Sequence, residues 1–287
     1  MLNLTKIAVD AMGGDGSPKK IIDGIIHNHK SNTQNFFIIF GNKNEIEPYI
    51  TNKIAKEFYE IIHTENMVKS TDSPLEAAKR GKDTSMWLAI NSVRNKEADI
   101  VISAGNTGAL LVISKLNLKM IENIDKPALS ALWPNKKGMS VVLDLGANIE
   151  CNSKNLVDFS IMGASLYKSL YPNNTPKIAL LNIGSEELKG NEIIKETFQI
   201  LNEKKFKNFD FFGYIEGNQL MDGNVNVIVS DGFTGNVALK TAEGTANFIT
   251  DELKKIFKES MLGKISAILN YYNLNKFKKR LDPRLYN

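Results

Sequence analysis

The stretch Asn226–Lys240, N-V-I-V-S-D-G-F-T-G-N-V-A-L-K, decides how the rest of the chain is interpreted. Its apolar run Val227–Val229 is typical of a buried parallel strand. A glycine-bearing turn, Asp231–Asn236, follows, and a helical pattern begins at Val237. Because the first turn of a helix points backbone N–H groups outward, this order favours an anion site. An ordinary connection between a strand and a helix would have the same features if this turn stood alone.

The same order of strand, polar turn and helix recurs along the chain. Further strands are predicted at Lys6–Met12, Asn35–Gly41, Tyr59–His63, Asp99–Ser103, Met139–Leu145, Lys177–Asn182 and Asp210–Gly213. The first helix is predicted to have Ser17 as its N-cap and Pro18 as its first residue. Further helices are predicted at Glu45–Tyr59, at Leu75–Asn95, from Ala109 onward, and at Asn155–Ser169. This alternation indicates an α/β fold with a mostly parallel sheet covered on both faces, in one domain over residues 1–287.

Small polar residues gather where the chain leaves a strand for a helix. The turns are Gly13–Gly16, Ala104–Gly108, Gly146–Asn148, Gly184–Glu192 and Asp231–Asn236. In open α/β sheets this edge binds ligands. The recurrence of such turns at one edge therefore favours a ligand site over turns that only connect elements.

The composition bounds the class of protein. The chain has 287 residues, 43% of them hydrophobic, and a net charge of +4, which is typical of a soluble globular protein and argues against a nucleic-acid-binding one. The single Cys151 has no partner for an internal disulfide, which suits a reducing cytosol. Met1–Gly16 is too short for a signal peptide, and no apolar run approaches the roughly 20 residues of a membrane span. We expect a cytoplasmic protein.

The polar edge lacks most catalytic side chains. His27, His29 and His63 stand apart from any nucleophile, and a solvated surface role is the commoner interpretation for His27 and His29 near the end of the first helix. Cys151 has no histidine near it in sequence, so a structural role is its commoner interpretation. No metal-ligand spacing and no G-x-S-x-G motif occur, and we expect neither a metal nor a cofactor. Backbone amides, small hydroxyls and a few lysines suit phosphate binding and oxyanion stabilisation. Attack of phosphate on a thioester is a reaction that needs little more.

Several stretches resemble, in order, the PlsX family of phosphate acyltransferases of bacterial phospholipid synthesis. They are Val9–Asp15 (V-D-A-M-G-G-D) with Pro18, Ser103–Leu110 (S-A-G-N-T-G-A-L), Leu143–Asn148 (L-D-L-G-A-N), Leu181–Asn191 (L-N-I-G-S-E-E-L-K-G-N) and Ser230–Lys240 (S-D-G-F-T-G-N-V-A-L-K). The resemblance runs through essentially the whole chain.

The resemblance implies an enzyme that transfers a long-chain acyl group from acyl carrier protein to inorganic phosphate. The acyl phosphate would then pass to a membrane glycerol-3-phosphate acyltransferase. It also implies an α/β/α sandwich similar to isocitrate dehydrogenase and phosphotransacetylase, a homodimer, and peripheral association with the inner face of the cell membrane.

Site residues follow from the positions that match the family motifs. The resemblance suggests catalytic roles for Asp231, Asn236, Lys240 and Lys189. It suggests binding of substrate or phosphate by Asp10, Gly13, Gly14, Asp15, Asn106, Thr107, Asn148, Asn191 and Gly235.

The chain departs from the family pattern in two places. The basic helix of the family here reads Arg80–Met86, R-G-K-D-T-S-M, with Asp83 where the family usually has lysine, which reduces the positive charge. The family also continues beyond the position of Leu281–Asn287 into a Gly-rich apolar segment, and we expect that this segment is absent.

Residues 246–281 are predicted to form a protruding helical arm. Apolar residues recur at helical spacing over Asn247–Tyr272 with lysines between them, and Gly263 is the expected break between two helices. Such a pattern fits a helix pair in a dimer or core with a solvated basic face, or a helix on an anionic membrane surface.

Two alternative functions stay open. One is a non-catalytic membrane scaffold that is inactive because the last family segment is missing. The other is an enzyme similar to phosphotransacetylase that uses acyl-coenzyme A.

Overall fold

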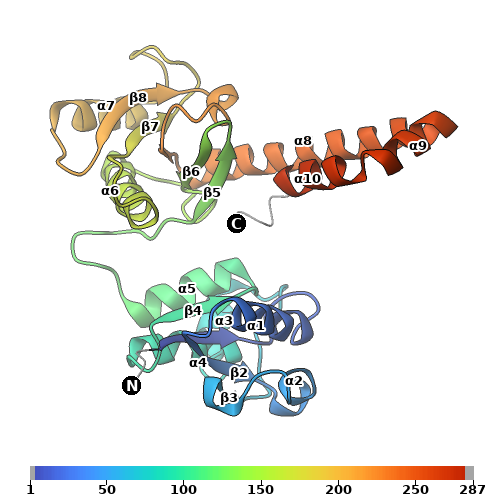
Figure 1. The fold of residues 1–287 in the computed structure, drawn as a ribbon. Helices are drawn as coiled ribbons and strands as arrows, with labels where there is room; N and C mark the ends of the chain where they lie inside the picture. The colour runs from blue at the N-terminus through green and yellow to red at the C-terminus, as the bar shows by residue number, and fades with distance from the viewer. Residues whose placement is uncertain (1–3, 282–287) are drawn as a thin grey trace. The chain divides into compact units, whose positions relative to one another are not determined.

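The computed structural model describes residues 4–281 and divides into two compact units, Met1–Glu122 and Asn123–Asn287 (Figure 1). Each unit has its own sheet, whereas the sequence pattern suggested a single sheet. Whether the units act as the one domain expected over residues 1–287 stays a prediction.

The first unit is a four-stranded parallel sheet with strand order β3-β2-β1-β4. Its strands are β1 (Thr5–Asp10), β2 (Asn35–Gly41), β3 (Tyr59–His63) and β4 (Ile100–Ser103). Its helices are α1 (Lys19–Ser31), α2 (Lys43–Ile50), the short η1 (Lys56–Phe58), α3 (Pro74–Arg80), α4 (Ser85–Arg94) and α5 (Thr107–Leu118). Ile7 and Val9 of β1 pack with Ile22 of α1, and Ala8 packs on the other face with Ala89 of α4. Helices therefore cover both faces.

The second unit is a five-stranded sheet with strand order β5-β6-β9-β7-β8. Its strands are β5 (Ser130–Asn135), β6 (Gly138–Leu143), β7 (Lys177–Leu181), β8 (Asp210–Ile215) and β9 (Val227–Val229). Its helices are α6 (Ser153–Leu170), α7 (Glu192–Glu203), the short η2 (Gly217–Gln219), α8 (Gly232–Glu259), α9 (Met261–Leu269) and α10 (Tyr271–Leu281). Only β5 runs antiparallel within this sheet.

The central strand β9 is buried on both faces. Val227 packs with Leu156 and Phe159 of α6, and Ile228 packs with the cluster that includes Leu239 of α8. The predicted α/β fold, with largely parallel strands and helices on both faces, is confirmed in each unit.

Four predicted helix boundaries were wrong, each for a local reason. Leu75–Asn95 is two helices because the chain breaks at Gly81, and Thr84 then caps α4 by accepting the Trp87 N–H. Glu45–Tyr59 is helical only to Ile50, since Asn52 takes a φ of 64°, outside the right-handed helical region.

The other two corrections concern caps. Ser17 is not the N-cap of α1: Pro18 holds that position, and the Ser17 hydroxyl donates to the Gly13 carbonyl. Helix α8 begins at Gly232 rather than Val237 because Asp231 caps it.

The predicted arm is helical and projects from the sheet of the second unit (Figure 1). The break expected at Gly263 was wrong, since α9 passes through that residue. The chain instead breaks at Ser260, whose hydroxyl accepts the Gly263 N–H at 2.9 Å, and again at Asn270. The prediction that the family's Gly-rich apolar segment is absent concerns the chain beyond Leu281, which lies outside the described residues. Within residues 4–281, no helix has the length and apolarity needed to cross a membrane.

Two helical glycines give opposite predictions for stability. A Cβ at Gly163 in α6 would lie 2.5 Å from Val227 Cγ1, whereas a Cβ at Gly244 in α8 would have no atom within 4 Å. Gly163→Ala is expected to lower the free energy of unfolding by about 1–3 kcal/mol through overpacking. Gly244→Ala is expected to raise it by about 0.5–1 kcal/mol through its better helix propensity. Urea unfolding of both variants measures this; a Gly163→Ala protein as stable as the parent would contradict the packing of α6 on β9.

Candidate functional site

Four of the five polar turns form one cluster in each unit, at the carboxyl ends of the strands. The Asp10 cluster consists of Asp10, Gly13, Gly14, Ser85, Ser103 and Gly105. The Asp144 cluster consists of Asp144, Asn148, Asp231, Gly232, Gly235 and Asn236.

Asp10 joins three elements of the first unit. It is the last residue of β1, and its side chain is buried. Its Oδ1 accepts the hydroxyl of Ser85 at the start of α4, and its Oδ2 accepts the hydroxyl of Ser103 at the end of β4, both at 2.6 Å. Ser103 Oγ in turn accepts the Gly105 N–H at 3.1 Å. The carboxylate therefore positions the turns rather than facing solvent.

Gly13 and Gly14 let two turns touch. A Cβ at Gly13 would lie 2.9 Å from the Gly105 Cα, and one at Gly14 would lie 2.4 Å from the Ala104 carbonyl oxygen. Gly14 also has a φ of 88°, which favours glycine. Both glycines are thus required by backbone contact, and Asp15 beside them is exposed.

Asn106 caps α5 and fixes a neighbouring loop. Its Oδ1 accepts the Ala109 N–H at 3.0 Å, and its Nδ2 donates to the Asp72 carbonyl at 2.9 Å. The N–H groups of Thr107 and Gly108 come before the first helical hydrogen bond of α5, as in any helix. This first turn can therefore offer backbone donors to an anion.

Asp144 is the most completely bonded carboxylate of the second unit's edge. It is fully buried. Its Oδ1 accepts backbone N–H groups from Leu129 (3.0 Å), Gly146 (3.1 Å) and Ala147 (2.9 Å). Its Oδ2 accepts the backbone N–H of Asn148 at 2.8 Å and the side-chain amide at 2.7 Å. This set of donors shapes the turn after β6.

That turn packs directly against the start of α8. A Cβ at Gly235 would lie 1.8 Å from the Asp144 carbonyl oxygen, so only glycine fits there. The Asn236 side-chain amide donates to the Leu145 carbonyl at 3.1 Å, and the Gly232 N–H donates to the Asn148 carbonyl at 2.8 Å. The structure thus brings four predicted site residues together: Asn148, Asp231, Gly235 and Asn236.

The first turn of α8 offers less to an anion than its sequence suggested. Asp231 Oδ1 accepts the Thr234 N–H at 2.8 Å, and its backbone carbonyl accepts the Gly235 N–H at 2.9 Å. With the Gly232 N–H bound to Asn148, three donors of this turn already have partners. The first N–H of α8 is thus already bonded and its cap is an acidic side chain, whereas α5 has a neutral amide as its cap, so the start of α5 is the better anion site.

The other residues predicted for the second unit's site, Lys189, Asn191 and Lys240, lie outside the Asp144 cluster. Lys240 is on the exposed surface of α8, with its ammonium 2.8 Å from Glu243 Oε2. Lys189 and Asn191 lie on the loop after β7, the strand next to β9. Asn191 caps α7 by accepting the Ile194 N–H, and the Lys189 carbonyl accepts the Asn182 side-chain amide. None of these contacts joins them to the Asp144 cluster.

Three organising residues were missed: Ser85, Ser103 and Asp144. Asp144 had a signal in the sequence, since like Asp10 it directly follows an apolar strand and precedes a glycine turn. Ser85 had none, because it reaches Asp10 from a position 75 residues away.

Cys151 has the character of a structural thiol. Burial raises the pKa of this thiol, with smaller opposing effects such as nearby Lys126. Its Sγ lies 3.6 Å from the Asn148 carbonyl oxygen. A raised pKa reduces the thiolate fraction at neutral pH, so this thiol is not an activated nucleophile. Within residues 4–281, no group of three or more His, Cys, Asp or Glu side chains is arranged to hold a metal ion.

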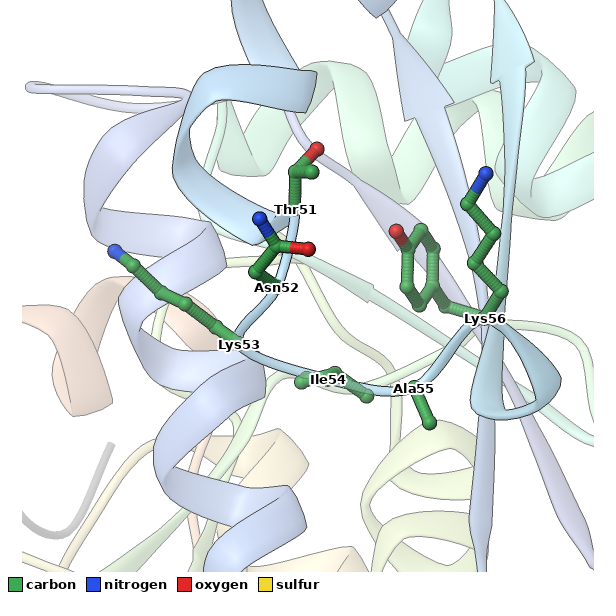
Figure 2. A pocket seen from close by; sticks show the side chains of 7 residues that line it. Thr51, Asn52, Lys53, Ile54, Ala55 and Lys56 are labelled. Carbon is green, nitrogen blue, oxygen red and sulfur yellow. The ribbon is translucent and has the colours of Figure 1, made fainter.

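A cavity of about 290 Å³ lies away from both clusters. Its lining residues are Thr51–Lys56, which precede β3, and Tyr59, the first residue of β3, so the cavity lies at the amino ends of the first unit's strands. Lys53 and Lys56 extend away from each other in Figure 2, so they do not converge on one ligand. This cavity is not the candidate site.

Comparison with known proteins adds the family context. The family model described as "Fatty acid synthesis protein" matches residues 5–287. The phosphate acyltransferase of Pelagibacter ubique is 74% identical over 287 residues, covering 100% of this chain and 86% of that protein. The phosphate acyltransferase of Paramagnetospirillum magneticum is 41% identical over 282 residues, covering 98% of this chain and 80% of that protein.

Solved structures resemble the fold at low sequence identity. The EutD phosphotransacetylase from Staphylococcus aureus has a TM-score of 0.59 at 14% identity, covering 86% of this chain and 83% of that one. A phosphotransacetylase from Streptococcus pyogenes also has a TM-score of 0.59, at 16% identity, covering 84% and 82%. The predicted similarity to the phosphotransacetylase fold is confirmed.

Asp144→Asn is expected to destabilise the second unit. The replacement amide would turn an NH₂ group toward backbone N–H donors, leaving buried groups without acceptors, at a cost of about 2 kcal/mol or more. Asp222→Asn is the matched control, because Asp222 makes a surface ion pair with Lys136 worth at most about 1 kcal/mol. Denaturant unfolding compares the two variants. Equal losses of stability in both would contradict the organising role of the Asp144 carboxylate.

Proposed function

The chain belongs to the phosphate acyltransferase (PlsX) family and is an acyltransferase, and we propose that it transfers a long-chain acyl group from acyl carrier protein to inorganic phosphate. The products are acyl phosphate and free carrier protein. The observation that carries the proposal is the 74% identity to a phosphate acyltransferase along all 287 residues. The proposed reaction needs positioning and charge stabilisation more than covalent chemistry, which suits edges built from amides and hydroxyls.

The proposed reaction is one substitution at the thioester carbonyl. A phosphate oxygen attacks the carbonyl carbon, the carbonyl oxygen takes the negative charge of the tetrahedral intermediate, and the carbon–sulfur bond breaks. The thiolate of the carrier's prosthetic arm leaves and takes up a proton from water. Backbone N–H groups at the start of α5, beside the Asp10 cluster, are suited to hold phosphate.

Catalytic roles are assigned to residues of the second unit. Asn236 and Lys240, on α8, would stabilise the negative charge of the intermediate, with Lys189 as a further cation from the loop after β7. Asp231 would position Asn236 and Lys240 by capping α8. Asp10, Gly13, Gly14 and Asn106 would shape the phosphate site, in which Asp15 and Thr107 are exposed.

We expect phosphate-dependent release of free carrier protein when the purified protein is mixed with palmitoyl-carrier-protein and phosphate. Palmitoyl-coenzyme A tests the alternative donor in the same assay, since the two thioesters differ only in the carrier. Thiol release is followed with a chromogenic disulfide. A folded protein that releases no thiol from either donor would overturn the proposed enzyme and favour a scaffold.

The catalytic assignment predicts a difference between two exposed lysines of α8. Lys240→Ala should lower turnover by more than about tenfold, because a positioned group that stabilises an oxyanion is lost. Lys254→Ala is the matched control: Lys254 is similarly exposed on the same helix and also pairs with a carboxylate three residues away. Thermal unfolding of both proteins checks that the fold is intact. Equal activity of the two variants would remove Lys240 from the active site.

The helical arm supports a proposed location at the membrane. In α9, Met261, Leu262, Ile268 and Leu269 are each at least 75% exposed. Lys264 lies among them, and further lysines follow in α10. An apolar helical face with flanking cations suits the surface of an anionic bilayer. The proposed enzyme is a cytoplasmic homodimer that binds the inner face of the membrane and supplies a membrane glycerol-3-phosphate acyltransferase.

Changing Leu262 and Ile265 together to Glu should release the protein from vesicles that contain phosphatidylglycerol. The two carboxylates oppose both insertion of the apolar face and attraction to the anionic surface. Vesicle sedimentation measures binding, and analytical ultracentrifugation measures the dimer. Lys276→Ala, Lys278→Ala and Lys279→Ala combined are the companion variant, expected to weaken binding with the dimer intact. If the Leu262→Glu, Ile265→Glu variant stays dimeric and still binds vesicles, this face of α9 does not contact the membrane.

A further inference from the structure

Large apolar side chains stand exposed on the turns around the Asp144 cluster. They are Ile149 (71% exposed), Ile183 (82%), Leu188 (87%) and Phe233 (63%). None packs in the hydrophobic core of its unit. Within the second unit they therefore remain uncovered, at the edge where the candidate catalytic residues Asn236 and Lys189 lie.

The four residues belong to turns that leave adjacent strands. Strand β9 lies between β6 and β7, parallel to both, and Val229 pairs with Leu143 on one side and Leu180 on the other. Ile149 follows β6, Phe233 follows β9, and Ile183 and Leu188 follow β7. Because neighbouring strands are about 4.8 Å apart, the turns stand side by side at one edge.

The turns of Ile149 and Phe233 are in direct contact. The Gly232 N–H donates to the Asn148 carbonyl at 2.8 Å, so the residue before Phe233 is bonded to the residue before Ile149. A Cβ at Gly232 would also lie 2.7 Å from that carbonyl oxygen. The close backbone approach brings these two exposed side chains to neighbouring positions.

Ile183 and Leu188 lie at the base of one closed loop. The Asn182 side-chain amide donates to the Lys189 carbonyl at 3.1 Å, and each of the two apolar residues is one position inside this bond. Gly190, with a φ of 96°, lets the chain pass close to Asn182. The rest of the loop, Gly184–Glu187, is polar or small, so its two large apolar side chains have no partner in the loop.

We propose that Ile149, Ile183, Leu188 and Phe233 hold the acyl chain of the thioester and give the enzyme a preference for long chains. The inference rests on the proposed function. An acyltransferase must hold the chain next to the carbonyl that reacts, and these side chains lie on the turn that carries Asn236 and on the turns after the two neighbouring strands. Burial of apolar surface rises with chain length, so binding through these residues favours long donors.

The test compares long and short donors in the double variant Ile183→Ser with Leu188→Ser. For the parent and the variant, kcat/KM is measured with palmitoyl- and butyryl-carrier-protein. The ratio of the two values is expected to fall by about tenfold or more, equivalent to about 1.4 kcal/mol, with butyryl transfer changed by less than about twofold. Leu170→Ser is the matched control, since Leu170 is 46% exposed at the end of α6, where the chain has returned to the amino edge of the same sheet. It should leave the ratio unchanged.

Other outcomes overturn the inference. An unchanged ratio of the two kcat/KM values would overturn it. An equal fall in kcat/KM for both donors would also overturn it, because the two residues would then contact the carrier protein rather than the acyl chain. A change from dimer to monomer in the variant would make this surface an interface between copies.

A measurement of ligand binding can test the acyl-chain surface even if the proposed function is wrong. If the parent transfers neither chain to phosphate, the proposed function fails, and calorimetry with the unreactive palmitoyl and butyryl phosphonates then decides. Tighter binding of the palmitoyl compound to the parent, weakened at least about tenfold in the double variant, supports the acyl-chain surface. Equal affinity for the two compounds overturns it.

Discussion

The second unit's candidate site depends on one buried carboxylate. Asp144 accepts hydrogen bonds from the backbone N–H groups of Leu129, Ala147 and Asn148 and from the Asn148 side-chain amide. Oriented N–H dipoles therefore stabilise this buried carboxylate. The turn that it shapes leaves room for α8 only because residue 235 is glycine. The direction of α8, and hence of Asn236 and Lys240, follows from that contact.

The two edges use buried aspartates differently. Asp10 is held by two hydroxyls, from Ser85 and Ser103, and therefore ties together elements far apart in sequence, whereas Asp144 is held mainly by its own turn. Most backbone N–H groups in the first turn of α8 donate hydrogen bonds to Asp231 or Asn148. In the first turn of α5, the N–H groups of Thr107 and Gly108 come before the first helical hydrogen bond and can face a ligand. This difference favours the start of α5 over the start of α8 as an anion site.

Much of the fold could be predicted because apolar runs and turn residues in the local sequence indicate where strands and helices begin and end. The strands Asn35–Gly41, Tyr59–His63 and Val227–Val229 have the predicted limits. Asn35–Gly41 and Val227–Val229 are short, largely apolar runs followed directly by polar turn residues, which is the pattern that predicts a strand. The break at Gly81 and the early start of α8 depend on caps, which compete with helix propensity over single residues. The division into two sheets and the antiparallel β5 depend on pairing, which a strand's own sequence does not specify. For the site, motif positions led to Asn148, Gly235 and Asn236, but the partners of Asp10 lay outside any local window.

The central claim is that phosphate, and not water, attacks the thioester. The most direct measurement is ³¹P NMR of the products formed from palmitoyl-carrier-protein and phosphate labelled with ¹⁸O at every oxygen. The account predicts palmitoyl phosphate in which the label is fully retained, because the attacking oxygen becomes the bridge between carbon and phosphorus. Release of free palmitate at the same rate with and without phosphate would contradict it.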